Sequence, residues 1–515
     1  MNRLHLCLLS ILLPLAAPLP LMAQQAEHDA AAPQAQQQRG ARSNGTAETR
    51  PSAEKLKPLP PDSTTRHTIT VEGVPLAFSA TAGTIRLYDA QQGNPQVDVA
   101  FIAFRRDDIA PEKRPVTFIF NGGPGYASGW LNLGAIGPWR LRMDAEAAYP
   151  SAPPVTVENA ETWLDFTDLV FIDPPGTGYS RILGGDDVRK RFFGVDGDID
   201  VLSATIRRWV EENGRMTSPK YIAGESYGGF RAPKIAHALQ TDQGLGVNGL
   251  VLISPVLDFA RFNSRLGLLD NVARLPSYAA TARQMKGQSV TRKDLADVEI
   301  YARGDYLADL MRGVKDADVI DRMSHRVADL TGLDFDTVRK LGGRVPVQVF
   351  LREIDRKNAR VGSQYDATVT GYDPTPFAPR SGADDQMRLG LHAPITQAMV
   401  ALYHDKLAWK VEGARYLFMN EQASHQWDWG RGQAEAVGSL RDAMALDPHM
   451  RVLVAQGLTD VVTPYLETQM VLDQIPTYGP GERLRFNVYP GGHMFYSRDD
   501  SRARFRDDAR GIIAR

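Results

Sequence analysis

The feature of this sequence that most constrains its fold is a set of short, nearly continuous apolar runs separated by segments with helical periodicity. The runs lie at 116–120, 169–172, 221–223, 250–253, 452–454 and 484–489. Runs this short are typical of strands that are buried on both faces, as in a parallel sheet covered by helices. The pattern therefore predicts an α/β protein with a mostly parallel central sheet flanked by helices.

Two kinds of segment surround these runs. Residues 68–71, 76–78, 84–88 and 97–104 alternate or run apolar in the manner of strands, which suggests an antiparallel start to the sheet. Helical patterns occupy 197–212 and 230–240, on either side of the third apolar run.

The pattern changes between about 260 and 391, where the chain is charged, rich in helix formers and without short β-branched runs. We interpret 260–391 as a helical insertion that forms a lid over the site. The α/β core then has two parts, 62–259 and 392–515, and helical periodicity returns to the core at 393–409 and 433–446.

The N-terminus has the layout of a secretory signal peptide over residues 1–23. Arg3 gives a positive charge, 4–21 is apolar but broken by prolines, and Ala23 offers a small residue at the cleavage point. Residues 24–61 are rich in Ala, Gln and Pro and predict a disordered linker. We therefore expect a secreted or periplasmic protein, with no stable membrane anchor after signal cleavage.

Charge and cysteine content exclude several classes of function. The formal net charge is −2, so nothing in the balance supports binding of nucleic acid. The single cysteine, Cys7, lies inside the predicted signal peptide, so we expect a mature chain without disulfides or a cysteine nucleophile.

The strongest local motif is at 224–229, which reads Gly-Glu-Ser-Tyr-Gly-Gly and fits the nucleophile elbow Gly-x-Ser-x-Gly. An apolar run ends at Ala223 and a helical segment begins at Phe230, which is the strand-turn-helix setting that this motif requires. The motif predicts Ser226 as a nucleophile on an α/β-hydrolase fold with a helical lid insertion.

A nucleophilic serine needs a general base and a group that orients the base. In this fold they follow the serine in the order Asp or Glu, then His, each after a later strand. Asp460 follows the run at 452–454, and His493 follows the run at 484–489 through Pro-Gly-Gly. We therefore predict a triad of Ser226, Asp460 and His493.

A second glycine-rich loop, 121–125, reads Asn-Gly-Gly-Pro-Gly and comes straight after the run at 116–120. A loop of this composition can bring backbone N–H groups close to a developing oxyanion. No His, Cys, Asp or Glu spacing resembles a metal site, so we expect neither a metal nor another cofactor.

Four motifs together resemble the serine carboxypeptidase family, peptidase family S10. They are the loop at 121–125, the segment Asp-Pro-Pro-Gly-Thr-Gly-Tyr-Ser at 173–180, the elbow at 224–229 and Gly-Gly-His-Met at 491–494. The resemblance covers roughly 116–255 and 451–496. It implies release of C-terminal residues from peptides through an acyl-enzyme intermediate.

The resemblance also implies roles for single residues. Ser226 attacks the carbonyl, His493 acts as base and then acid, and Asp460 orients His493. The backbone N–H groups of Gly123 and Tyr227 would form the oxyanion hole. Substrate binding falls to Asn121, Gly122, Glu225 and Met494, the first three at the free α-carboxylate of the substrate. Glu225 can bind a carboxylate only when it is protonated, which favours acidic pH.

The chain departs from the family at one instructive position. The family has a second glutamate two residues before a Gly-Pro, hydrogen-bonded to the glutamate beside the serine, and here that place is taken by Ala135. The substitution favours an alternative: an esterase, an acyltransferase or a proline-directed aminopeptidase on the same scaffold. A non-catalytic binding protein is the remote alternative, because all three triad positions are filled. The partner in the enzymatic cases is a peptide or a small ester or amide.

Overall fold

The computed structural model describes residues 57–144, 147–259, 267–378, 381–432, 434–479 and 481–514. The predicted signal peptide, most of the predicted linker and Cys7 lie outside the described residues, as does the predicted boundary at 260.

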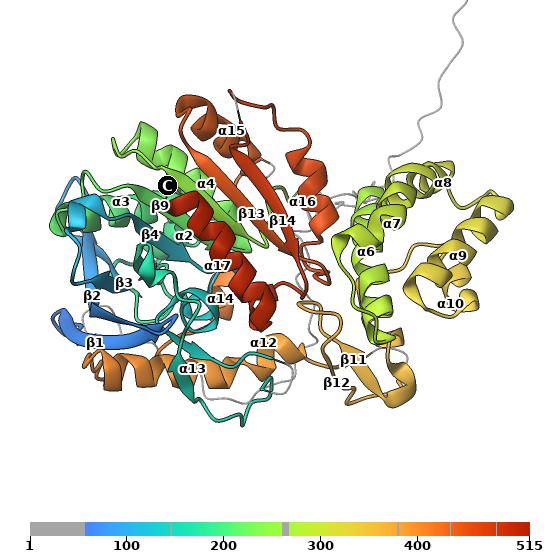
Figure 1. The fold of residues 1–515 in the computed structure, drawn as a ribbon, viewed down its shortest axis with the longest axis horizontal. Coiled ribbons are helices and arrows are strands. Elements are labelled where there is room, and N and C mark those ends of the chain that lie inside the picture. The colour runs from blue at the N-terminus through green and yellow to red at the C-terminus, as the bar shows by residue number, and fades with distance from the viewer. Residues whose placement is uncertain are drawn as a thin grey trace, which may run out of the picture.

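A ten-stranded sheet forms the centre of the molecule, in the order β1-β2-β3-β7-β4-β9-β10-β13-β14, with β8 paired to β3 outside that path (Figure 1). The strands of this sheet are β1 (Ser63–Val71), β2 (Val74–Tyr88), β3 (Pro95–Arg106), β4 (Val116–Phe120), β7 (Asp168–Ile172), β8 (Arg181–Ile182), β9 (Lys220–Glu225), β10 (Gly249–Ile253), β13 (Arg451–Gly457) and β14 (Leu484–Tyr489). Two short hairpins pair β5 (Trp139–Leu141) with β6 (Thr156–Glu158) and β11 (Arg360–Gly362) with β12 (Thr370–Tyr372).

The strand directions confirm the predicted mixture. β1, β2, β3 and β7 pair antiparallel in succession, whereas every pair from β7 to β14 is parallel. The two stretches 76–78 and 84–88 lie in the single long strand β2. The intervening 79–83 is built from small residues, which carry no strong strand signal but continue the ladder with β3.

Helices cover both faces of the sheet. The α-helices of the described residues are α1 (Gly129–Leu131), α2 (Asp186–Phe192), α3 (Val195–Glu212), α4 (Tyr227–Thr241), α6 (Leu268–Met285), α7 (Ala296–Tyr301), α8 (Leu307–Arg312), α9 (Ala317–Thr331), α10 (Phe335–Lys340), α11 (Val347–Glu353), α12 (Gln386–Gly390), α13 (His392–Ala401), α14 (Glu421–His425), α15 (Val437–Leu446), α16 (Tyr465–Leu472) and α17 (Asp499–Ile513).

Successive strand residues pack into different cores, as the period of two in a strand requires. In β4, Phe118 and Phe120 pack in the core with α3, α4 and α15, whereas Ile119 packs in the core with α13 and α17. All five residues of β4 are buried. The continuous apolar run therefore reflects burial on both faces, as predicted.

β14 differs from the prediction of a strand buried on both faces. It is the last strand in the sheet order, and Leu484 to Val488 are only partly buried. Arg485 and Asn487 interrupt its apolar residues, which is typical of a strand at an edge.

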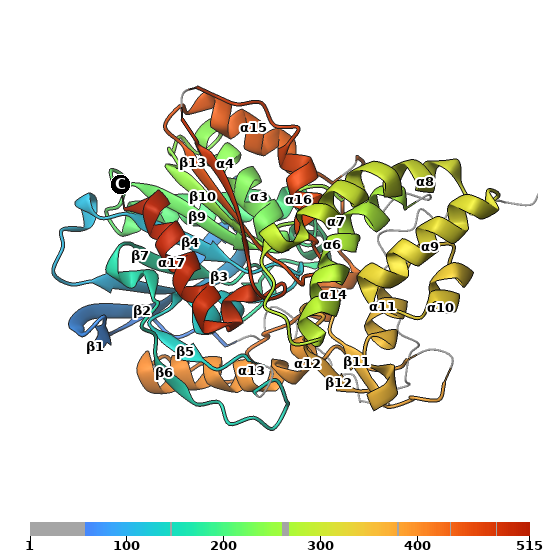
Figure 2. The ribbon, with the colours of Figure 1, turned by 45° about the vertical axis from the view of Figure 1, so that its right-hand side comes forward.

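The segment between β10 and α12 is mainly helical. Helices α6 to α11 share a hydrophobic core of their own, which also includes Leu458, Val461 and Tyr465 from the second part of the α/β core. Figures 1 and 2 show α6 to α10 grouped beside the sheet, with the β11–β12 hairpin below them. The division at 260 and 391 stays a prediction.

After this segment the chain returns to the sheet. α13 packs with the core that contains α17, and α15 packs against α4. In the part of the chain that is described, no helix is long and apolar enough to cross a membrane.

Candidate active site

The candidate site lies at the carboxyl ends of the parallel strands, where backbone hydrogen bonds join successive loops. Ser226 N donates to the carbonyl of Ile253 at 2.9 Å, and Ser254 N donates to Ala455 at 2.7 Å. Thr459 N donates to Gly491 at 2.9 Å. These bonds bring the loops that follow β9, β10, β13 and β14 together, although the chain between them is long.

Ser226 occupies a strained turn between β9 and α4. Its φ is 59° and its ψ is −120°, a conformation that non-glycine residues rarely adopt. The flanking glycines are required by close approach: a Cβ on Gly224 would lie 2.0 Å from the Gly228 carbonyl oxygen, and one on Gly228 would lie 2.7 Å from that of Phe120. The strain presents the partly exposed Ser226 side chain at the end of the sheet.

Asp460 and His493 form a buried hydrogen-bonded pair. His493 Nδ1 lies 2.7 Å from Asp460 Oδ2, and the two side chains are 3% and 0% exposed. A carboxylate accepts, so the Nδ1 of neutral His493 carries the proton and its Nε2 is left as the basic nitrogen. This is the arrangement that a general base requires.

Thr463 completes the surroundings of Asp460 and is a residue that the sequence reasoning missed. Its hydroxyl donates to Asp460 Oδ2 at 2.7 Å, while the N–H groups of Val462 and Thr463 donate to Oδ1 at 2.8 and 3.0 Å. The available signal was the spacing Asp-x-x-Thr, in which a carboxylate accepts from the backbone that follows it.

Burial disfavours the charged form of His493, but Asp460 and Glu225 oppose that effect. The Asp460 carboxylate acts both through its charge and through the hydrogen bond. Together they raise the pKa of His493 above its ordinary value of 6.5.

The glycine loop at 121–125 lies directly against the elbow. A Cβ on Gly122 would stand 2.5 Å from the Tyr227 nitrogen, so only glycine allows this approach. Tyr227 is the first residue of α4, and the first N–H groups of a helix have no acceptor within the helix. Gly123 is exposed and has a φ of 109°. The two predicted oxyanion-hole residues therefore belong to adjoining segments.

Glu225 is buried beside Ser226 and accepts two hydrogen bonds. Asn121 Nδ2 donates to Oε2, and the hydroxyl of Tyr496 donates to Oε1 at 2.6 Å. Asn121 is itself held in place, because its Oδ1 accepts from Leu131 N at 3.1 Å. Tyr496 is a further residue that the sequence reasoning missed, although it stands only three residues after His493.

Burial raises the pKa of Glu225 to about 7, against the lowering effects of His493, Tyr496 and Asn121. Below about pH 7 this carboxyl is therefore mainly protonated. A protonated carboxyl has one O–H to donate, and a carboxylate group of a ligand would accept it.

A segment from the region between β10 and α12 covers the histidine loop. His493 N donates to the carbonyl of Tyr365, and the two rings meet edge to face at 5.4 Å between centroids. Asp366 accepts from Thr459 Oγ1 at 2.7 Å and from Arg498 Nη2 at 2.9 Å. The loops that carry Asp460 and His493 are thus fastened to the predicted lid.

Met494 packs in the hydrophobic core beside the candidate site. Its side chain is 4% exposed and packs in the hydrophobic core that also includes Tyr496 and Phe495. Its role in substrate binding stays a prediction.

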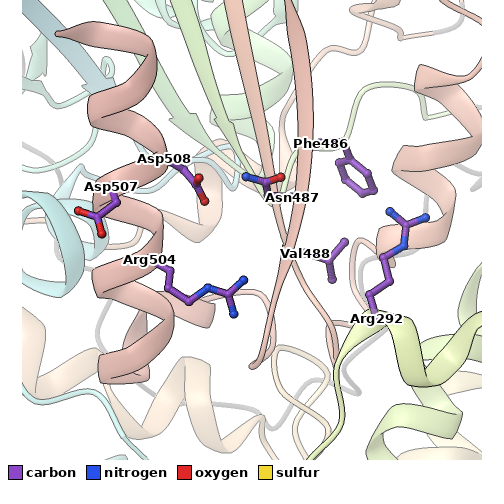
Figure 3. A pocket seen from close by; sticks show the side chains of 7 residues that line it. All are labelled: Arg292, Phe486, Asn487, Val488, Arg504, Asp507 and Asp508. Carbon is purple, nitrogen blue, oxygen red and sulfur yellow. The ribbon is translucent and has the colours of Figure 1, made fainter. Parts of the chain in front are cut away.

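A separate hollow of about 430 Å³ lies between β14 and α17. In Figure 3, Asn487 points toward α17, whereas Phe486 and Val488 lie on the side of Arg292. None of the triad residues lines this hollow. Over the described ranges, no group of three or more His, Cys, Asp or Glu residues could hold a metal ion.

Comparison with known proteins points to one family. Residues 83–265 match the family model described as serine carboxypeptidase. The pheromone-processing carboxypeptidase KEX1 of Fusarium vanettenii is 30% identical over 237 residues, which are 42% of this chain and 36% of that protein. The protein of the same name from Aspergillus niger is 31% identical over 179 residues, 34% of this chain and 26% of the relative. The chain thus spans about a third or less of the length of these curated relatives.

A solved structure extends the similarity of fold to most of the chain. The crystal structure of KEX1(delta)p, a prohormone-processing carboxypeptidase from Saccharomyces cerevisiae, superposes with a TM-score of 0.54 and 16% identity. The superposition covers 90% of this chain and 96% of that chain. The predicted α/β-hydrolase fold is confirmed. The resemblance drawn from the motifs is confirmed as well: residues 83–265 of this chain are similar to the serine carboxypeptidase family.

Proposed function

We propose that this protein is a secreted serine-type carboxypeptidase that removes C-terminal residues from peptides through an acyl-enzyme intermediate. Ser226 is the nucleophile, His493 the general base and acid, and Asp460 the residue that orients His493. The oxyanion hole is formed by the N–H groups of Gly123 and Tyr227.

Acylation begins when His493 Nε2 takes the proton of the Ser226 hydroxyl while Oγ bonds to the carbonyl carbon of the scissile peptide. The negative charge that develops on the carbonyl oxygen is stabilised by the N–H groups of the oxyanion hole. His493 then gives its proton to the nitrogen of the leaving amino acid, the C–N bond breaks and the acyl group stays on Ser226.

Deacylation repeats these steps with water. His493 Nε2 takes a proton from water, whose oxygen bonds to the ester carbon, and the proton is then returned to Ser226 Oγ as the ester bond breaks. Throughout, Asp460 holds the imidazole through Nδ1 and stabilises the imidazolium.

The observation that supports a carboxypeptidase over other serine hydrolases is the buried pair of Asn121 and Glu225 beside the nucleophile. A triad alone would suit any acyl transfer. A carboxyl group whose pKa is about 7 can donate a hydrogen bond to the terminal carboxylate of a peptide at mildly acidic pH. In this proposal Asn121 Nδ2 and the N–H of Gly122 also donate to the terminal carboxylate.

The test is the cleavage of an N-blocked dipeptide beside its C-terminal amide, from pH 4 to 8. We expect the free acid to be preferred below about pH 7, where Glu225 is protonated. Ser226→Ala is the control and should abolish turnover of both substrates. Two outcomes would contradict the carboxypeptidase assignment: equal cleavage of both substrates, or cleavage of neither while a simple ester is hydrolysed. Either outcome would still be consistent with a serine hydrolase.

The alternative is an esterase or acyltransferase, and Ala135 is the residue that favours it. With alanine at position 135, the glutamate pair that the resemblance implies is incomplete. The same two substrates and a simple ester distinguish this alternative from the carboxypeptidase.

A further inference from the structure

Tyr496 is joined to the candidate carboxylate site by one short hydrogen bond. Its hydroxyl donates to Glu225 Oε1 at 2.6 Å, and its side chain is fully buried. The pKa of Tyr496 is raised well above 10 by burial and by Glu225, so the hydroxyl stays a donor over the whole working range of pH.

The chain makes room for this tyrosine at Gly134, the residue before Ala135. The segment η3 (Asn132–Ile136) packs against η9 (Phe495–Ser497). A Cβ on Gly134 would lie 2.9 Å from a ring carbon of Tyr496, and Ala135 lies in the same hydrophobic core. The lack of a side chain at Gly134 therefore leaves room for the large ring of Tyr496, and Ala135 is the next residue in the chain.

Glu225 is consequently held at both oxygens by neutral donors. Asn121 Nδ2 faces Oε2 and Tyr496 Oη faces Oε1. Neither donor is a second carboxylate that could share the proton of Glu225, because the amide of Asn121 does not titrate and the pKa of Tyr496 is raised well above 10. The tyrosine therefore fixes the orientation of Glu225 without sharing its proton.

We propose that Tyr496 is the positioning residue that holds Glu225 for binding the α-carboxylate of the substrate, with a hydroxyl where a second carboxyl group would otherwise be needed. This inference rests on the proposed carboxypeptidase function. Tyr496 acts through Glu225 and does not touch the reacting atoms.

The pH range of recognition follows from this arrangement. The titratable and charged groups that act on Glu225 are His493, Asp460 and Tyr496, beside the neutral Asn121. A hydrogen bond from Tyr496 stabilises the ionised form and lowers the pKa of Glu225, partly offsetting burial. Loss of the hydroxyl should raise that pKa, so that a substrate carboxylate is accepted at higher pH.

The experiment compares the wild type with Tyr496→Phe on the N-blocked dipeptide and its C-terminal amide. Both substrates need Ser226 and His493, so the ratio of their kcat/KM values cancels the titration of His493 and leaves that of Glu225. In the wild type the preference for the acid should fall with a half-point near pH 7. In Tyr496→Phe we expect the half-point to rise by about one pH unit or more, the size of a hydrogen bond to a charged group.

A matched control removes another buried hydroxyl that serves a carboxylate outside the site. Tyr489 Oη donates to Asp508 Oδ2 at 2.6 Å, so Tyr489→Phe should leave the half-point unchanged. An unchanged or lowered half-point in Tyr496→Phe would overturn the inference, while the proposed function would stand. Absence of any acid preference in the wild type would instead contradict the proposed function.

A second measurement applies if Tyr496→Phe folds but turns over substrate too slowly for its pH dependence to be measured. The infrared carbonyl band of protonated Glu225 can be identified as the band lost in Glu225→Gln, and its titration followed without substrate. A higher midpoint in Tyr496→Phe than in the wild type supports the inference, and an equal midpoint overturns it.

Discussion

At the scale of single residues, three side chains of the candidate site are held by hydrogen bonds with their immediate neighbours. Asp460 is fully buried and accepts from His493, Thr463 and two backbone N–H groups. His493 is thereby held in one tautomer. Burial raises the pKa of Glu225 and so keeps it mainly protonated below about pH 7. Each group is suited to a different proton transfer or hydrogen bond, although all lie at one end of the sheet.

The proposed orienting role of Asp460 predicts the result of replacing it by asparagine. In Asp460→Asn the side-chain amide can present an N–H to His493, which favours the wrong tautomer for a base. We expect kcat to fall by roughly 10³- to 10⁴-fold with KM little changed. Steady-state kinetics on the N-blocked dipeptide measure this, and a loss confined to KM would contradict the assignment.

The raised pKa values of His493 and Glu225 predict different pH profiles for two substrates. His493 must be neutral to act as base, so kcat/KM for an ester or amide should rise with pH through a value above 6.5. The free acid also needs protonated Glu225, so its kcat/KM should fall again above about pH 7. If kcat/KM for the free acid does not fall above about pH 7, Glu225 does not bind the carboxylate of the substrate.

The residues of the site differ in how far the sequence reveals them. Ser226 and His493 stand in glycine-rich motifs next to strands, so a local pattern identifies them. Thr463 is marked only by the short spacing Asp-x-x-Thr after Asp460, and Tyr496 acts through a side-chain contact that only the folded chain creates. Tyr365 reaches His493 from a segment more than a hundred residues away in the chain, which no periodicity could indicate.

At the scale of elements, α3 and α4 hold the elbow and the glycine loop together through a buried ion pair. Arg231 in α4 pairs with Asp198 in α3 at 2.6 Å, and its Nη1 donates to the Asn121 carbonyl at 2.8 Å. Both charged side chains are almost fully buried. The position of Asn121 thus depends on two helices and on the loop after β4.

Removing one member of this pair leaves a buried charge without compensation. We expect Asp198→Ala to lower the free energy of unfolding by about 3–5 kcal/mol. Asp186→Ala is the control, because its pair with Arg189 is exposed to water and contributes little. Urea unfolding of both variants measures the difference, and an equal loss in the two would contradict this account of Arg231.

Elements were predictable where the sequence carries a simple apolar or helical pattern. β4 and β14 begin and end at the predicted residues, and α3 and α4 extend the predicted helices by a few residues. The hairpins β5–β6 and β11–β12 have short, partly exposed strands, so they give no continuous apolar run. Their existence depends on contacts rather than on local sequence.

At the scale of the whole molecule, three distant segments meet over the histidine loop. Asp366, in the segment between β10 and α12, binds Thr459 from the loop after β13 and Arg498 from the start of α17. The predicted lid is therefore hydrogen-bonded to both of the loops that carry Asp460 and His493. The interruption of the sheet pattern in the sequence predicts a lid over the site. The sequence does not predict which residues of the lid contact these loops.

Loss of the hydrogen bonds between Asp366 and the loops should affect turnover more than folding. In Asp366→Ala we expect kcat/KM for the N-blocked dipeptide to fall by about 10- to 100-fold, because small displacements of catalytic groups are costly. Asp373→Ala, which removes a buried carboxylate in the same segment, is the control and should retain turnover. A greater kinetic loss in the control would contradict a positioning role for Asp366.

The central claim is that Ser226 carries the acyl group, and trapping that intermediate tests it most directly. The protein is mixed with an N-blocked amino acid 4-nitrophenyl ester, quenched in acid and digested for mass spectrometry. We predict one acyl group per chain on the peptide that contains Ser226, removable by hydroxylamine and absent in Ser226→Ala. An acyl group on another residue, or turnover that persists in Ser226→Ala, would contradict the account.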